Sequence, residues 1–184
     1  MATGCYERGA QRDSISYHAF ADPSGGSADS FTLAIGHYLY DQQVVVVDAL
    51  RETKPPFNPE AVVDEYTRLL KSYGISSIIG DRYAGIWPAA EFAKVGISYE
   101  ASAVPKSDLY GGLLPLLNSR RIELLDNDRL VQQLVGLERR TARSGKDSID
   151  HGPGGHDDVC NAVAGLSAIA SEYGGYDFQY RGFQ

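Results

Sequence analysis

Cysteine is scarce in this chain, with two residues among 184. Two cysteines cannot form a disulfide framework, so we expect a protein of a reducing compartment. No apolar run approaches the roughly 18–20 residues that a transmembrane helix needs, and the N-terminal residues lack the apolar stretch of a secretory signal. These absences exclude a disulfide-rich secreted protein and a helical membrane protein. We expect a soluble intracellular domain with no membrane partner.

Positive charge is also scarce. The chain has 17 Lys and Arg residues against 24 Asp and Glu residues, which gives a net charge of −7. A protein that binds nucleic acid by neutralising phosphates is usually basic on at least one face. The balance therefore argues against a strong stand-alone nucleic-acid binder, and it favours an enzyme or an acidic site for divalent cations.

The length is typical of one domain, with tails at either end. We expect 1–15 to be an N-terminal tail or linker, 16–173 the domain, and 174–184 a Gly- and aromatic-rich C-terminal tail. Hydrophobic patterning and turn residues predict strands over 17–21, 31–40, 43–50, 75–80, 97–101 and 122–125. Helices are predicted over 59–73, 86–95, 106–118, 128–139 and 155–173, with a polar hairpin or loop over 143–155.

This order of elements is typical of an α/β fold with a mixed central β-sheet flanked by helices. The first three strands, joined by short turns, form an antiparallel meander. The helix over 59–73 then leads into strand 75–80, which the right-handed crossover rule places parallel to the first strand. The last helix, over 155–173, has apolar residues at helical spacing and is expected to be amphipathic.

Acidic residues follow two predicted strands and begin the last helix. Asp22 ends the first strand, Asp81 follows strand 75–80, and Asp157 and Asp158 come after the flexible run GPGG. If those strands are parallel neighbours, Asp22 and Asp81 leave the sheet side by side, and the packed helix brings Asp157 to them. Clustered carboxylates are tolerated when they bind hard cations. Two such ions about 3.5–4 Å apart can activate water and stabilise the leaving oxygen of a phosphodiester.

Each acidic residue also has an ordinary structural explanation. Asp22 stands in a turn rich in Pro and Gly, and Asp81 could cap the following segment. Asp157 or Asp158 could simply favour the positive end of a helix. Any one of these residues alone is weak evidence. Three of them at consistent topological positions favour metal-dependent chemistry.

Several motifs are similar to those of one protein family. They are 19–26 (AFADPSGG) with 29–31 (DSF), 79–82 (IGDR), 155–162 (GHDDVCNA), 106–110 (KSDLY) and 121–125 (RIELL). The first three resemble the acidic motifs of the nuclease domain of bacteriophage terminase large subunits, and the other two look typical of that family. The most specific is the HDD-x-x-NA run after a Gly-rich loop. The similarity extends from about residue 16 to residue 170.

The resemblance implies an RNase H-like three-layer fold, shared with Holliday-junction resolvases and retroviral integrases. It implies a metal-dependent endonuclease that cuts concatemeric double-stranded viral DNA with little sequence specificity. Acidic residues would hold two divalent cations, Mg²⁺ or Mn²⁺. Asp22 would bridge both ions, Asp81 and Asp157 would complete the two shells, and Asp158 would ligate or give support from outside. Water activated between the ions would attack in line, leaving a 3′-hydroxyl and a 5′-phosphate.

Partners and setting are implied in the same way. In the full assembly the partners are a packaging ATPase domain, the small terminase subunit and the portal, in the host cytoplasm. The full-length subunit of this family has an N-terminal packaging ATPase. This chain contains no Gly-x-x-x-x-Gly-Lys-Ser/Thr loop, the phosphate-binding motif of such ATPases. We therefore expect an excised domain or a gene fragment that does not hydrolyse ATP by itself.

Basic residues that could contact DNA are concentrated in one stretch. Arg139, Arg140, Arg143 and Lys146 fall within eight residues that contain no acidic side chain. This segment leads into the loop before the third motif, so phosphate contact is one interpretation and a solvated basic loop is the other. Arg82, next to the second motif, could orient a phosphate or form a structural ion pair.

Three further interpretations stay open. His151, His156 and Cys160 could bind zinc, although a fourth ligand with suitable spacing is missing. A Holliday-junction-resolvase-like nuclease would prefer four-way DNA to linear duplex. A catalytically silent docking module would share the fold without the chemistry, and the presence of all three acidic motifs argues against it.

Overall fold

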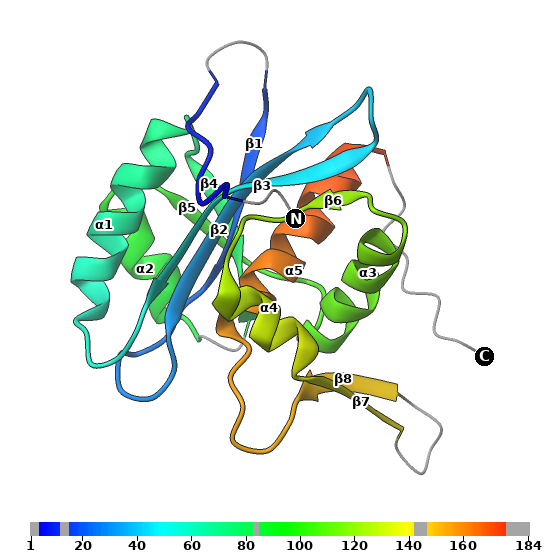
Figure 1. The fold of residues 1–184 in the computed structure, drawn as a ribbon. Helices are drawn as coiled ribbons and strands as arrows, with labels where there is room; N and C mark the ends of the chain where they lie inside the picture. The colour runs from blue at the N-terminus through cyan, green and yellow to red at the C-terminus, as the bar shows by residue number, and fades with distance from the viewer. Residues whose placement is uncertain (1–3, 12–14, 83–84, 142–146, 176–184) are drawn as a thin grey trace.

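The computed structural model describes residues 4–11, 15–82, 85–141 and 147–175. At its centre is a mixed sheet of six strands, in the order β5-β4-β1-β2-β3-β6 (Figure 1). The strands are β1 (Tyr17–Asp22), β2 (Phe31–Leu39), β3 (Val44–Thr53), β4 (Ser77–Gly80), β5 (Ser98–Ala101) and β6 (Ile122–Glu123). The predicted α/β class with a mixed sheet is confirmed.

The pairing of the strands follows the expected topology. Strands β1, β2 and β3 form the antiparallel meander, and β4 lies parallel to β1 with Ala21 opposite Gly80. Strands β5 and β6 add parallel neighbours to β4 and β3. The β-branched run at the start of β3 is buried on both faces, because helices cover the two sides of the sheet.

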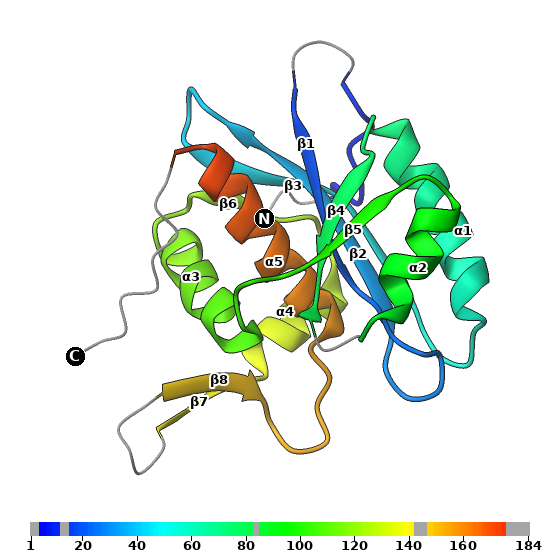
Figure 2. The ribbon, with the colours of Figure 1, turned by 180° about the vertical axis from the view of Figure 1, so that it is seen from behind.

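Helices form the two outer layers (Figures 1 and 2). Helices α1 (Pro59–Ser72) and α2 (Trp87–Lys94) cover one face, and α3 (Lys106–Asn118), α4 (Asp128–Val135) and α5 (Asp158–Tyr173) cover the other. Helix α1 begins as expected, because the Asn58 side chain accepts a hydrogen bond from the Glu60 N–H at 2.8 Å and Pro59 occupies the first turn. The result is the predicted three-layer arrangement.

The predicted helix over 128–139 is wrong in its last turn. Helix α4 ends at Val135, where the Gly136 N–H caps it by donating to the carbonyls of Gln132 and Gln133. The chain then forms β7 (Leu137–Thr141), which pairs with β8 (Asp147–His151) in a separate antiparallel hairpin. Residues 137–139, which have helical spacing in the sequence, thus pair as a strand in the hairpin and do not extend α4. The expected strand over 122–125 is also shorter, since only the first two residues pair.

Helix α5 lies between the sheet and helices α3 and α4. All its residues from Asp158 to Ser171 are buried, so it is enclosed on nearly every side where the sequence predicted an amphipathic helix. Gly165 allows the close approach to the sheet, because a Cβ atom there would lie 2.3 Å from the ring of Phe20 in β1. This contact sets the distance between α5 and the sheet. It also brings the N-terminus of α5 to the ends of β1 and β4.

The described part of the N-terminal segment contacts the sheet. The Arg8 N–H donates to the Asp48 carbonyl at 2.7 Å, and the Arg8 side chain reaches the Val47 carbonyl. The division of the chain into tails and a domain stays a prediction. In the described residues, no helix combines the length and the apolar character that crossing a membrane requires.

Candidate active site

Two parallel strands place Asp22 and Asp81 next to each other. Asp22 is the last residue of β1, and Asp81 directly follows β4. The Asp81 N–H donates to the Ala21 carbonyl at 2.9 Å, which extends the parallel pairing by one residue. Both carboxyl groups therefore leave the same edge of the sheet, as the topology predicted.

Helix α5 brings the third motif to this edge. Asp157 is its N-cap residue and Asp158 its first residue. The Asn161 amide nitrogen donates to Oδ2 of Asp22 at 2.9 Å and to Oδ2 of Asp81 at 2.8 Å. The structure thus brings together the four acidic residues predicted from the sequence. All four line one pocket of about 770 Å³.

Burial and neighbouring acidic groups act on the carboxyl groups of this pocket. Burial raises the pKa of Asp22 well above its ordinary value, the hydrogen bond from Asn161 opposes this, and the nearby Asp81, Asp158 and Asp157 raise it further. Burial also raises the pKa of Asp158, with a further contribution from nearby Asp29. Negative charge is therefore concentrated here at a cost in free energy that a bound cation would remove.

Asp157 has two partners that the sequence did not assign. The Tyr110 hydroxyl donates to Asp157 Oδ2 at 2.7 Å, and Lys106 Nζ lies 3.0 Å from the same atom. Lys106 also lies 3.1 Å from Asp150 Oδ1. Burial acts to lower the pKa of Lys106, but its hydrogen bonds and ion pairs with Asp157 and Asp150 outweigh this and raise it. Both partners belong to the KSDLY run, a motif to which the sequence alone assigns no role.

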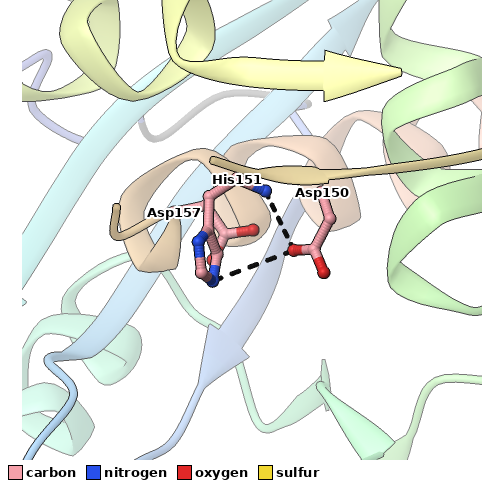
Figure 3. A group of neighbouring side chains, drawn as sticks. All are labelled: Asp150, His151 and Asp157. Carbon is pink, nitrogen blue, oxygen red and sulfur yellow. Dashed lines mark hydrogen bonds and ion pairs between the residues drawn. The ribbon is translucent and has the colours of Figure 1, made fainter. Parts of the chain in front are cut away.

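Strand β8 adds a second group of ligand atoms beside Asp157. Atoms of Asp150, His151 and Asp157 lie within 4.8 Å of one another (Figure 3). Sequence reasoning missed Asp150, because nothing in a polar loop marks one aspartate as facing a pocket. In the described residues, this metal-ligating group contains neither His156 nor Cys160. Burial raises the pKa of the Cys160 thiol, which disfavours the zinc interpretation.

The donor set of the pocket fits a hard divalent cation. Asp22, Asp81, Asp157 and Asp158 offer carboxylate oxygens, the ligands that Mg²⁺ and Mn²⁺ prefer. Asp158 Oδ2 is buried and has no hydrogen-bond partner in the part of the chain that the structure describes. A buried carboxylate oxygen without a donor calls for an explanation, and a cation provides one.

The basic residues predicted to contact DNA that the structure describes, Arg82, Arg139 and Arg140, are not part of the pocket lining. The Arg82 side chain donates to the Ala103 carbonyl. On β7, Arg139 Nε donates to Asp147 at 2.8 Å, and Arg140 donates to Glu138 at 3.0 Å. Both β7 side chains are about half exposed. The remaining two predicted residues, Arg143 and Lys146, lie outside the described residues.

Comparison with known proteins gives matches in structure alone. No family model and no curated protein sequence matches the chain. The large terminase nuclease of thermophilic phage G20c matches with a TM-score of 0.71 and 19% identity, covering 94% of each chain. The chain has the fold of large terminase nuclease domains. The large terminase nuclease domain of Thermus phage P74-26 matches with a TM-score of 0.72 and 18% identity, covering 94% of this chain and 95% of that chain.

The match extends to a longer large terminase. The bacteriophage HK97 large terminase gives a TM-score of 0.67 and 16% identity, covering 89% of this chain and 41% of that one. At these identities the likeness concerns the fold. The RNase H-like three-layer architecture, and the resemblance to terminase nucleases seen in the sequence, are confirmed at that level.

Proposed function

We propose that the chain is the metal-dependent DNA endonuclease domain of a viral DNA-packaging large terminase. The observation that carries this proposal is the pocket itself. Three segments far apart in the sequence bring Asp22, Asp81, Asp157 and Asp158 together on this fold, and one buried carboxylate oxygen has no donor among the residues that the structure describes. Structures of the G20c nuclease with magnesium and of the Sf6 nuclease with manganese support the choice of ions.

The substrate in this proposal is concatemeric double-stranded DNA, cut with little sequence specificity. A phosphodiester carries negative charge, so it cannot enter an anionic pocket without cations. Two Mg²⁺ or Mn²⁺ ions would neutralise this charge and lower the pKa of bound water. Asp22 and Asp81 would hold them from the sheet, and Asp157 and Asp158 from α5.

The protein's own groups orient these ligands. The Tyr110 hydroxyl donates to Asp157 Oδ2 at 2.7 Å, so it holds the rotamer of that carboxylate. The Thr32 hydroxyl donates to the Asp158 carbonyl at 2.8 Å, which ties the start of α5 to β2. Ligands held in this way by neighbouring hydrogen bonds lose little entropy when they bind.

The wider setting belongs to the same proposal. In the assembly the domain would work with a packaging ATPase domain, the small terminase subunit and the portal, in the host cytoplasm. Arg139 and Arg140 on β7 would contact DNA phosphates, because β8 of the same hairpin carries Asp150 and His151 into the pocket lining. Arg82, Arg143 and Lys146 are proposed as further contacts to DNA.

Incubation of supercoiled plasmid with the protein in Mn²⁺, Mg²⁺ or EDTA tests the proposal. We expect nicked and linear products with metal and none in EDTA. Asp22→Asn should abolish cleavage and keep the fold, whereas the matched change Asp41→Asn, at an exposed turn residue away from the pocket, should cleave as the wild type does. Equal activity of the two variants would contradict the proposal. Preference for four-way junctions would favour the resolvase alternative, and inactivity in every metal the docking module.

A further inference from the structure

Asn161 contacts two acidic residues that come from different strands. It lies in the first turn of α5 and is 1% exposed. An amide nitrogen carries two N–H donors, and here Nδ2 donates to one oxygen of Asp22 and to one oxygen of Asp81. We propose that Asn161 is a positioning residue of the metal site, holding these two carboxylates at their mutual spacing before a cation binds. The inference rests on the proposed function.

Repulsion between the two carboxylates gives such a residue a role. Asp22 and Asp81 lie at neighbouring strand ends, where Asp81 is buried and Asp22 is partly buried, and like charges there interact more strongly than in water. A donor shared by both carboxylates offsets this repulsion. Lys106 lines the same pocket, but its ammonium contacts Asp157 and Asp150. A neutral amide attracts both carboxylates and, unlike a lysine, adds no positive charge that would repel a cation.

The backbone of α5 fixes the direction of the amide. The Asn161 N–H donates to the Asp157 carbonyl at 2.7 Å, so Asn161 stands one helical turn beyond Asp157 and on the same face. Asp157 and Asn161 therefore face the strand ends together. The spacing D-x-x-x-N in the third motif is explained by this geometry.

The other atom of the amide supports the same role. Asn161 Oδ1 is buried and has no hydrogen-bond partner among the described residues. An unsatisfied buried acceptor destabilises the fold, and an aliphatic side chain at this position would avoid it. The opposite amide orientation would place Oδ1 against two carboxylate oxygens. The amide is thus oriented by its two donor contacts, as expected if they serve the site.

Metal affinity separates this role from simple packing. We expect Asn161→Ala to raise the Kd for Mn²⁺ by about tenfold or more, as loss of a residue that orients ligands does. Asn161→Asp keeps the shape but replaces the donor with a further negative charge. This variant should have a lower Tm than the wild type in EDTA. Adding Mn²⁺ should raise the Tm of the variant by more than it raises the Tm of the wild type. Ser167→Ala is the matched control, a buried α5 residue whose hydroxyl donates to the Val163 carbonyl.

The experiment is calorimetric titration of Mn²⁺ into each variant without DNA, with Tm in EDTA and circular dichroism beside it. Weakened binding by Asn161→Ala with unchanged binding by Ser167→Ala supports the proposal. A Kd within twofold of the wild type in folded Asn161→Ala overturns it, while plasmid cleavage by the wild type still supports the nuclease. Unfolding of both Asn161 variants would assign the residue to the core and overturn it too. Absence of Mn²⁺ binding by the wild type would overturn both inferences.

Discussion

Lys106 lies between two acidic residues from different elements, 3.0 Å from Asp157 Oδ2 and 3.1 Å from Asp150 Oδ1. A lysine in helix α3 therefore links the N-cap of α5 to strand β8 of the hairpin. Because Asp157 is buried, its partner matters more than the partner of a surface carboxylate.

Replacing Lys106 with the uncharged Met tests this link. We expect Lys106→Met to lower Tm in EDTA, because Asp157 would become a buried charge without its cation. The affinity of the Lys106→Met variant for Mn²⁺ should be higher than that of the wild type, because a positive charge that competes for Asp157 has been removed. Differential scanning calorimetry and Mn²⁺ titration measure the two effects. Lys71→Met, on the far face in α1, is the control, and weaker Mn²⁺ binding by Lys106→Met would contradict the prediction.

Stability without metal should depend on pH through Asp22. Its pKa in the folded chain is raised above the ordinary 3.8, so the folded state holds this proton more tightly than the unfolded state. The stability it contributes is present below the unfolded pKa and is lost as pH rises through the folded pKa. In EDTA, the wild type should therefore lose Tm relative to Asp22→Asn as pH rises above about 4.

The same comparison in Mn²⁺ provides the control for that pH effect. The cation neutralises the ionised carboxylate, so the wild type should recover its Tm at neutral pH while Asp22→Asn gains much less. Thermal scans at several pH values with and without metal measure this. A Tm difference in EDTA that stays constant, or that shifts in favour of the wild type as pH rises, would be incompatible with the raised pKa.

The Tyr110 hydroxyl is expected to stabilise the buried Asp157 carboxylate. Tyr110→Phe removes that donor and keeps the ring, so it should cost about 1.5–3 kcal/mol, the usual range for a hydrogen bond to a charged group. Chemical denaturation gives the free energy of unfolding. Tyr40→Phe, at an exposed tyrosine, should change it by less than about 0.5 kcal/mol. Similar losses in both variants would argue against a specific role for the Tyr110 contact.

Gly165 sets how closely α5 approaches the sheet. A methyl group there would meet the Phe20 ring, so Gly165→Ala should destabilise the protein by about 1–3 kcal/mol despite the better helix propensity of alanine. Displacement of α5 should also lower cleavage, because its first turn carries Asp157 and Asp158. Gly9→Ala is the control, because no atom of the described residues lies within 4 Å of the added Cβ. An unchanged denaturation midpoint in Gly165→Ala would show that α5 can shift freely.

Contact between the β7–β8 hairpin and DNA should be visible in the salt dependence of DNA binding. If Arg140 contacts a phosphate, Arg140→Ala should weaken DNA binding uniformly across sequences and reduce the salt dependence, log Kd against log salt, by about one unit. Fluorescence anisotropy with a metal-free duplex measures both. Arg68→Ala, exposed on α1 at the opposite face, should leave the slope unchanged. Equal slopes for the two variants would place the DNA path elsewhere.

The sheet and the positions of the acidic residues were predictable because they depend on local signals. Strand ends at Asp22 and Asp81 follow from turn residues and hydrophobic runs, and the crossover rule then makes the strands parallel neighbours. The third motif was marked by the Gly-rich loop before a helix. These signals are all contained within short stretches of sequence.

The parts that were missed depend on tertiary contacts. The run 137–139 has helical spacing, but pairing with β8 makes it a strand. The enclosure of α5 depends on α3 and α4 packing over it, which no pattern within α5 reveals. Lys106 and Asp150 became site residues only because separate elements place them around Asp157.

The order of the pocket's residues along the chain has a consequence for synthesis. Asp22 and Asn161, which are hydrogen-bonded, stand 139 positions apart. A ribosome therefore completes the sheet edge with Asp22 and Asp81 well before it makes the helix that joins them. Until α5 emerges and docks, the nascent chain lacks half of the acidic cluster, so in the proposed enzyme DNA cutting cannot begin before the third motif has been made.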